Sequence, residues 1–200
     1  MSKIIESAGC HVYFYFCYFL SCIRCCRIPA APWSFRVFGR LSVSPHARIA
    51  NSAYIQVDHA ASLVIGSGVH VGPCAHIIVP SGCHSVIGPG SSVMHFSVLS
   101  GSFVVGSDVL ISPRVTLLSG SHSYRSATAT IRDQDVRSPV PDCPVSIGDD
   151  CWICTGNVVL PGSVIRSGTI VGTPTPSPKS TQPYSVYAAS TNLSQKSFRD

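Results

Sequence analysis

Charged side chains are scarce in this chain of 200 residues. Asp, Glu, Lys and Arg make up 12% of it, whereas hydrophobic residues make up 45%. A disordered chain has the opposite balance, so the composition excludes intrinsic disorder. A chain of this length can form one domain with its own core. We therefore expect a folded and largely apolar architecture.

Acidic residues are almost absent from the N-terminal quarter. Residues 1–57 hold six Lys or Arg and a single carboxylate, Glu6, so the formal net charge of +5 arises at this end. A basic surface attracts nucleic acids, anionic lipids or nucleotides. Because the excess is confined to one quarter of the chain, we expect no nucleic-acid partner.

The N-terminal segment also lacks an apolar run of membrane-spanning length. The run Val12–Leu20 lies within residues 7–23, which contain no Lys, Arg, Asp or Glu. A spanning helix needs about 20 apolar residues. Three interpretations remain open: a helix packed on the body, an interfacial membrane contact through residues 7–27, or a signal peptide. Glu6 and the lack of a small-residue cleavage site disfavour the signal peptide.

Cysteine is abundant but does not form the pattern of a small secreted scaffold. Five of the ten cysteines crowd into Cys10–Cys26, and the others lie in aliphatic segments. Disulfide scaffolds are usually shorter chains. We expect reduced thiols and a cytoplasmic protein, held at the inner face of the membrane if the N-terminal segment binds lipid.

Aliphatic residues recur every six positions through the rest of the chain. The long array consists of Ile87, Val93, Leu99, Val105, Ile111 and Leu117, followed by Ile147, Ile153, Val159, Ile165 and Val171. Shorter arrays in other phases precede it: Val43, Ile49 and Ile55, then Ile65, Val71 and Ile77. Glycine often follows the repeated aliphatic residue, as at Gly88 and Gly106.

A period of six indicates short strands joined by tight turns, with the aliphatic residue pointing inward. One such unit cannot bury its aliphatic residue alone, so successive coils must stack into a solenoid. An antiparallel barrel would show longer alternating strands, which are missing. Between Leu117 and Ile147 the pattern stops and then resumes in phase, which predicts an inserted loop at about residues 119–146. Long loops on rigid scaffolds often carry function.

The order of motifs across this loop resembles that of a known family. Val104–Gln134 leads through a strand to His122 and an Ile-Arg-x-Gln sequence, and the loop is followed by IGDD-x-WI at 147–153. An LPG turn and the sequence Pro183–Val186 complete the series. Over about 130 residues the chain resembles the hexapeptide-repeat O-acetyltransferases of the maltose, nodulation-factor and exopolysaccharide branch.

This resemblance implies an all-β, left-handed parallel β-helix with three hexads per coil. It also implies a homotrimer with active sites between subunits. The reaction would transfer an acetyl group from acetyl-CoA to a hydroxyl of a sugar or glycan precursor, and no metal is expected. His122 matches the family's catalytic histidine, which acts as a general base on the acceptor hydroxyl.

The resemblance also assigns the substrate contacts. Matching positions for acetyl-CoA are Thr155, Thr173, Pro178 and Lys179. The spacing from Thr155 to Thr173 equals three hexads, which is one full coil, so we expect them on the same side of the solenoid. His95 and Ser97 match positions that contact the acceptor.

Two zinc-based alternatives compete with this function. The γ-class carbonic anhydrases share the fold and bind zinc through three histidines, but His70 and His76 are six positions apart and should lie on adjacent faces. The pairs Cys22/Cys25 and Cys151/Cys154 are spaced like zinc ligands, although the second pair lies inside a repeat.

The alternative from another class is a catalytically degenerate, trimeric scaffold or binding protein. Prolines 174, 176 and 178 in the last coil favour it, because proline removes N–H donors. For the whole chain we expect an apolar and basic segment at 1–40, the β-helix domain at 41–187, and a C-terminal tail at 188–200.

Overall fold

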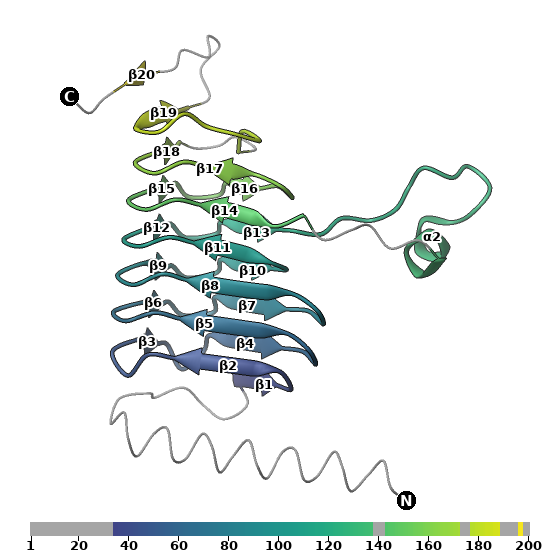
Figure 1. Cartoon of the computed structure of the whole chain (residues 1–200), viewed down its shortest axis with the longest axis horizontal. Helices are drawn as coiled ribbons and strands as arrows, with labels where there is room; N and C mark the ends of the chain where they lie inside the picture. Colours follow the sequence, from purple (N-terminus) through teal and green to yellow (C-terminus); the bar gives the residue numbers. More distant parts are fainter. Residues whose placement is uncertain (1–33, 138–142, 173–176, 189–195, 198–200) are drawn as a thin grey trace, which may run out of the picture.

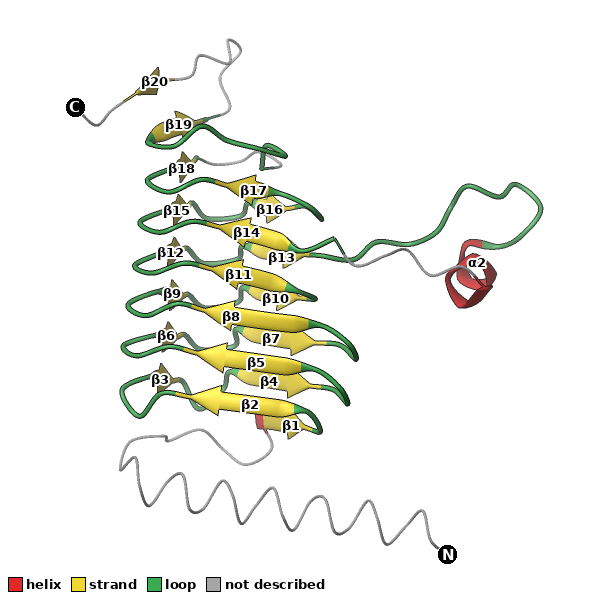
Figure 2. Ribbon diagram, viewed as in Figure 1, coloured by secondary structure: helices red, strands yellow, loops and turns green. Residues whose placement is uncertain are grey.

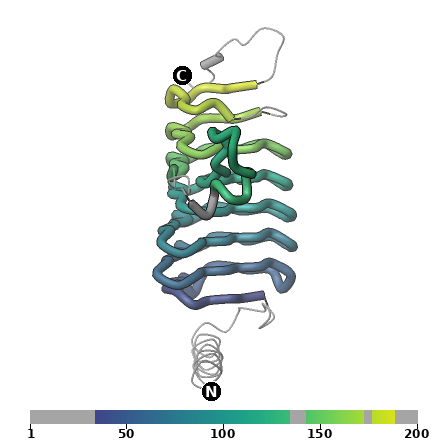
Figure 3. The backbone as a smooth tube through the Cα atoms, turned by 90° about the vertical axis from the view of Figure 1, so that its right-hand side faces the viewer, coloured from purple at the N-terminus to yellow at the C-terminus, as the bar shows by residue number. Residues whose placement is uncertain are grey.

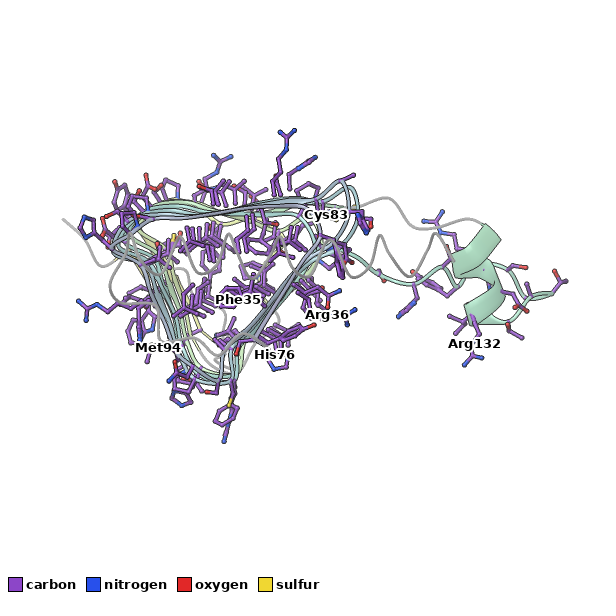
Figure 4. The ribbon with its side chains drawn as sticks, turned by 90° about the horizontal axis from the view of Figure 1, so that it is seen from below. Phe35, Arg36, His76, Cys83, Met94 and Arg132 are labelled. Carbon is purple, nitrogen blue, oxygen red and sulfur yellow. The ribbon has the colours of Figure 1, made fainter. Side chains whose placement is uncertain are left out.

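A computed structural model describes residues 34–137, 143–172, 177–188 and 196–197. Short strands wind in successive coils into a prism of triangular cross-section (Figures 1 and 4). Equivalent strands of successive coils pair in parallel and form three sheets, which are the three faces of the prism. The parallel β-helix predicted from the six-residue period is therefore confirmed.

Each face receives one strand from each of the first six coils, and face 3 carries two further strands at its upper end (Figure 2). Face 1 consists of β1 (Phe35–Val37), β4 (Tyr54–Val57), β7 (His76–Val79), β10 (Val98–Ser100), β13 (Thr116–Leu118) and β16 (Val158–Val159). Face 2 consists of β2 (Arg40–Val43), β5 (Ser62–Ile65), β8 (His84–Ile87), β11 (Phe103–Val105), β14 (Val145–Ile147) and β17 (Val164–Ile165). Face 3 consists of β3 (Arg48–Ile49), β6 (His70–Val71), β9 (Ser92–Val93), β12 (Leu110–Ile111), β15 (Trp152–Ile153), β18 (Ile170–Val171), β19 (Ser185–Tyr187) and β20 (Lys196–Ser197). We name the corners by the faces that they join.

The repeated aliphatic residues fill the interior of the prism. Every member of the long array from Ile87 to Val171 is at most 1% exposed. Each lies directly above its counterpart in the coil below, as Ile153 does above Ile111. This inward direction is the one that the six-residue period predicted, and burial of this stack is the main apolar contribution to stability.

The lower coils are longer than the predicted three hexads. In an upper coil Val98 pairs with Thr116, which is a spacing of three hexads. In a lower coil Tyr54 pairs with His76, so this coil holds four more residues. The extra residues form tight turns at the 1–2 corner, at 58–61 and 80–83, and these turns project further than the turn between β10 and β11 in Figure 1. The shorter arrays stood in other phases for this reason.

The two ends differ from the predicted boundaries. The ladder begins with β1, ahead of the predicted start at residue 41, because Phe35 faces inward and pairs with Ile55. Within the predicted tail, β20 pairs with β19 and is antiparallel to it. The predicted N-terminal helix and the membrane contact through residues 7–27 lie outside the described residues. No helix among the described residues is long and apolar enough to span a membrane.

The glycines after the repeated aliphatic residues allow close approach of neighbouring coils at the 2–3 corner. A Cβ atom at Gly88 would lie 2.5 Å from the carbonyl carbon of Gly106 in the next coil. Neither glycine has a positive φ, so the constraint is space between backbones and not the turn conformation.

We expect Gly88→Ala to destabilise the solenoid by about 1–3 kcal/mol, because the coils must move apart to admit the methyl group. The matched control is Gly120→Ala, where an added Cβ has no neighbour within 4 Å. Urea unfolding followed by circular dichroism measures both. Equal midpoints for the two variants would contradict the close-approach explanation.

Candidate active site

The inserted segment leaves the prism at the 1–2 corner, between β13 and β14. It contains the short helix α2 (Ile131–Arg137) and projects away from the coils (Figure 1), so that it is drawn in front of them when this side faces the viewer (Figure 3). Its base is fixed to the scaffold: Ser119 N–H donates to the Ser100 carbonyl at 3.0 Å, and Cys143 N–H donates to the Ser119 carbonyl at 2.9 Å. The insertion was predicted at about 119–146, and its position is confirmed.

His122 lies in the first part of this segment, shortly after the buried Ser119. Its side chain is exposed. The Ser119 hydroxyl accepts a hydrogen bond from Ser102 N–H at 2.7 Å, so the chain is anchored just before the histidine. His122 is thus attached to a rigid coil while it remains accessible to a ligand.

The glutamine of the Ile-Arg-x-Gln motif holds the outer part of the segment together. Gln134 is 8% exposed, and its amide nitrogen donates to the carbonyl groups of Ser126 and Ala129 at 3.1 and 3.0 Å. Its amide oxygen accepts from Ser126 N–H at 2.8 Å. Thr130 caps the helix through a 3.2 Å bond from Asp133 N–H. The motif is visible in the sequence, but this role of Gln134 was not predicted.

A second group of predicted site residues lies at the 3–1 corner. His95 is half-buried and Thr155 is exposed. The two occur in the same column of turns, because Arg114 N–H donates to the His95 carbonyl at 3.1 Å and Gly156 N–H donates to the Pro113 carbonyl at 3.2 Å. Thr173, predicted to continue this column, lies outside the described residues.

Ser97 belongs to the scaffold of this corner. It is completely buried, and its hydroxyl donates to the Ser112 carbonyl at 3.0 Å and accepts from Val115 N–H at 3.2 Å. Two coils above, the buried Asn157 makes similar bonds to the carbonyl groups of Cys154 and Val171. His95 is therefore the accessible member of the predicted acceptor pair.

Pro178 and Lys179 return to the 1–2 corner. Ser177 N–H donates to the Val158 carbonyl on face 1, and Val164 N–H on face 2 donates to the Lys179 carbonyl at 2.8 Å. Pro178 thus lies between the two faces, and the Lys179 side chain is exposed. This last coil is short, because Ile170 pairs with Val186, a spacing smaller than three hexads.

The predicted site residues thus occur in two groups within one chain. His122, Pro178 and Lys179 lie at the 1–2 corner, whereas His95 and Thr155 lie at the 3–1 corner. Face 1 separates the two groups, and they do not meet in a single pocket of this chain.

Trp152 is a candidate site residue that was not predicted from the sequence. It stands on face 3 between Leu110 and Ile170, is 45% exposed, and donates from its indole N–H to the Ser112 hydroxyl at 2.9 Å. A signal was present, because the residue before an inward aliphatic position, here Ile153, must point outward.

The neighbouring acidic motif and cysteine pair have structural roles. Asp149 accepts a hydrogen bond from Ser107 N–H at 2.7 Å and joins two coils at the 2–3 corner. Cys151 is buried, and its thiol donates to the Arg166 carbonyl at 3.1 Å. Burial raises the pKa of the Cys151 thiol and of the Cys154 thiol, which disfavours the thiolate that zinc requires.

The histidines that suggested a carbonic anhydrase site lie on different faces, His70 on face 3 and His76 on face 1, as the spacing predicted. Throughout the described part of the chain, no three His, Cys, Asp or Glu side chains gather into a metal site. Cys22 and Cys25 lie outside the described residues.

Comparison by sequence finds similarity to WcaF, whose name describes it as a candidate acetyltransferase of colanic acid biosynthesis. The chain is 35% identical to WcaF of Escherichia coli (strain K12) over 72 residues, and equally similar to that of Shigella flexneri. The matched segment covers 36% of this chain and 35% of WcaF, so the chain spans about a third of the length of the relatives that it matches. No family model matches the chain.

Comparison by structure finds the same solenoid in a hexapeptide transferase family protein and in two acetyltransferases. A hexapeptide transferase family protein from Anaplasma phagocytophilum aligns with a TM-score of 0.54 at 17% identity, covering 80% of this chain and 78% of that one. The polysialic acid O-acetyltransferase OatWY aligns with a TM-score of 0.52 at 14% identity, covering 82% of this chain and 87% of its own. The polysialic acid-specific acetyltransferase NeuO aligns with a TM-score of 0.51 at 13% identity, covering 80% and 81%.

At these identities the structural likeness shows the fold, which is the left-handed β-helix expected from the sequence motifs. The shared 72 residues with WcaF add similarity in sequence. The predicted resemblance is therefore confirmed: in fold and in part of its sequence, this chain resembles the hexapeptide-repeat acetyltransferases.

Proposed function

We propose that the protein is an O-acetyltransferase that moves an acetyl group from acetyl-CoA to a hydroxyl group of a saccharide or glycan precursor. The observation that carries this proposal is the placement of His122, an exposed imidazole anchored beside a fixed corner of the solenoid. The names of WcaF, OatWY and NeuO describe the same reaction class and polysaccharide-related roles. Because acetyl-CoA is an intracellular donor, the proposal places the protein in the cytoplasm.

In this proposal His122 acts as the general base. A sugar hydroxyl is a poor nucleophile until its proton is removed, and imidazole can accept that proton as the oxygen attacks the thioester carbonyl. The C–S bond then breaks, the acetyl group stays on the sugar oxygen, and the imidazolium returns its proton to the thiolate of CoA. Atoms and charge balance without a metal ion.

The two groups of site residues support an active site shared between subunits of a homotrimer. Both corners border face 1, so neighbouring subunits can form a groove in which the 1–2 corner of one faces the 3–1 corner of the next. His122 and Lys179 would come from one side, and His95 and Thr155 from the other. Such a groove explains why one chain alone does not bring them together.

The donor would lie along the upper coils. Lys179 provides an exposed cation for the phosphates of CoA, beside Pro178 at the end of the groove. Thr155 would border the pantetheine arm, and the exposed Trp152 offers an apolar surface near the same coil. His95 would contact the acceptor.

The second candidate is a non-catalytic trimeric scaffold. The observation that favours it is the shortened last coil, in which Ile170 pairs with Val186 before three hexads are complete and prolines replace potential N–H donors. A scaffold needs neither acetyl-CoA binding nor an accessible His122, so the two candidates differ in both of the experiments below.

We expect His122→Ala to lower kcat/KM for acetyl transfer by roughly 10²–10⁴-fold, because it removes the general base. Release of the CoA thiol in the presence of a panel of saccharide acceptors measures the rate. The matched control is His46→Ala, an exposed histidine at the 2–3 corner, which should keep full activity. Transfer at the parental rate by His122→Ala would disprove the catalytic assignment.

We expect acetyl-CoA to bind the folded oligomer. Lys179→Ala should raise the Kd for acetyl-CoA about tenfold, because a charge-assisted contact with phosphate is lost. Isothermal titration calorimetry measures this without an acceptor. Arg48→Ala, an exposed cation at the opposite end of the prism, should bind as the parent does. If the folded oligomer fails to bind acetyl-CoA at all, the scaffold becomes the better account.

A further inference from the structure

Positive charge gathers at the base of the prism, far from the donor end. Residues 34–107 contain three arginines and only one carboxylate, Asp58. Each face of the first coil presents one arginine: Arg36 on β1, Arg40 on β2 and Arg48 on β3, all exposed. A surface with this charge attracts anionic ligands.

Two of these arginines lie at the 1–2 corner: Arg36 contacts the Phe38 ring, which stacks on His59, and Arg40 follows two residues after Phe38. We call these four residues the basal cluster. The ring centroids of Phe38 and His59 are 5.1 Å apart and their planes differ by 28°. The guanidinium carbon of Arg36 lies 5.9 Å from the Phe38 centroid. The N–H groups of Phe38 and Arg40 donate to the next coil at 2.7 and 2.9 Å, so the backbone of the cluster is fixed.

The carboxylate beside the cluster is bonded to a neutral partner. Gln56 donates from its amide nitrogen to the Asp58 carboxylate at 2.9 Å, and its amide oxygen accepts from the Tyr54 hydroxyl at 2.8 Å. Both arginine side chains of the basal cluster are exposed in the part of the chain that the structure describes, so their charge and their N–H donors are accessible there.

The basal cluster lies on the same corner of the prism as the segment that carries His122. Viewed from below, Arg36 stands beside the corner from which that segment leaves (Figure 4). The 1–2 corner of the first coil and the base of the insertion are separated by four strand steps on face 1, from β1 to β13. At the usual spacing of paired strands this is roughly 20 Å along the corner. A monosaccharide cannot span that distance, whereas an extended oligosaccharide can.

We propose that the acceptor is an extended acidic glycan, and that the basal cluster binds its carboxylated sugars while a more distant hydroxyl of the same polymer reaches His122. This inference rests on the proposed function and adds the substrate class. Guanidinium groups bind carboxylates through two parallel hydrogen bonds. The half-buried Phe38 ring adds an apolar surface against which a sugar ring packs.

The direct test is binding of a fluorescent galacturonic acid oligosaccharide that is long enough to span the corner, measured by anisotropy. Arg40→Ala should raise the Kd for the oligosaccharide about tenfold, because one bidentate contact is lost. Arg40→Lys should give an intermediate Kd, since it keeps the charge but loses the planar fork. The matched control is Arg48→Ala, which removes the same charge from the same coil but on face 3. It should bind as the parent does.

Three results would overturn the proposal. Equal weakening by Arg40→Ala and Arg48→Ala would mean a diffuse charge effect, and equal binding of the carboxyl-reduced oligosaccharide would exclude carboxylate recognition. The third result concerns phosphatidylglycerol–phosphatidylcholine vesicles. If Arg40→Ala loses binding to these vesicles but still binds the oligosaccharide, the cluster binds lipid and not the glycan.

The two proposals fail in different ways. If the basal cluster is a docking site, Arg40→Ala raises the KM for the acidic oligosaccharide and leaves transfer to a short neutral acceptor unchanged. If only the catalytic assignment is wrong, His122→Ala keeps its transfer rate while the dependence of binding on Arg40 persists.

Discussion

The whole structure depends on one constraint: an aliphatic side chain in each short strand becomes buried only when its coil lies directly on the next. Ile111 and Ile153 illustrate this, since they pair in register and are both fully buried. Backbone hydrogen bonds between coils fix the register, and Gly88 and Gly106 let the coils approach closely. Because the core fixes the path of every coil, variation is confined to the corners and the outer faces.

The corners are consequently where function is placed. The 1–2 corner tolerates additional chain, first as tight turns in the lower coils and then as the insertion that bears His122. The 3–1 corner keeps a uniform column of turns that presents His95 and Thr155 two coils apart. One continuous corner thus carries the basal cluster, His122 and Lys179, the residues of the proposed acceptor and donor sites, along a line parallel to the axis.

Much of this architecture could be predicted from the sequence, because a six-residue period has few other physical explanations. The insertion was predictable for the same reason, since the phase resumed at Ile147. The longer lower coils were not predicted: the shift of the aliphatic phase between Ile55 and Ile65 was visible, but a phase shift alone does not show that residues are added at one corner. Burial of Ser97 and the bonds of Gln134 were equally hidden, since a polar residue can serve either a ligand or the backbone. The proposed pairing of chains across a groove depends on contacts that one chain does not contain.

The measurement that tests the central claim most directly is complementation between two inactive chains. His122→Ala removes the base from the 1–2 corner, and Thr155→Trp blocks the 3–1 corner, so each variant alone should fail to transfer acetyl. Mixed oligomers of the two should regain transfer, because some grooves combine an intact His122 from one chain with an intact Thr155 from the other. If co-assembled chains remain as inactive as the separate variants, the active site is not shared between subunits as proposed.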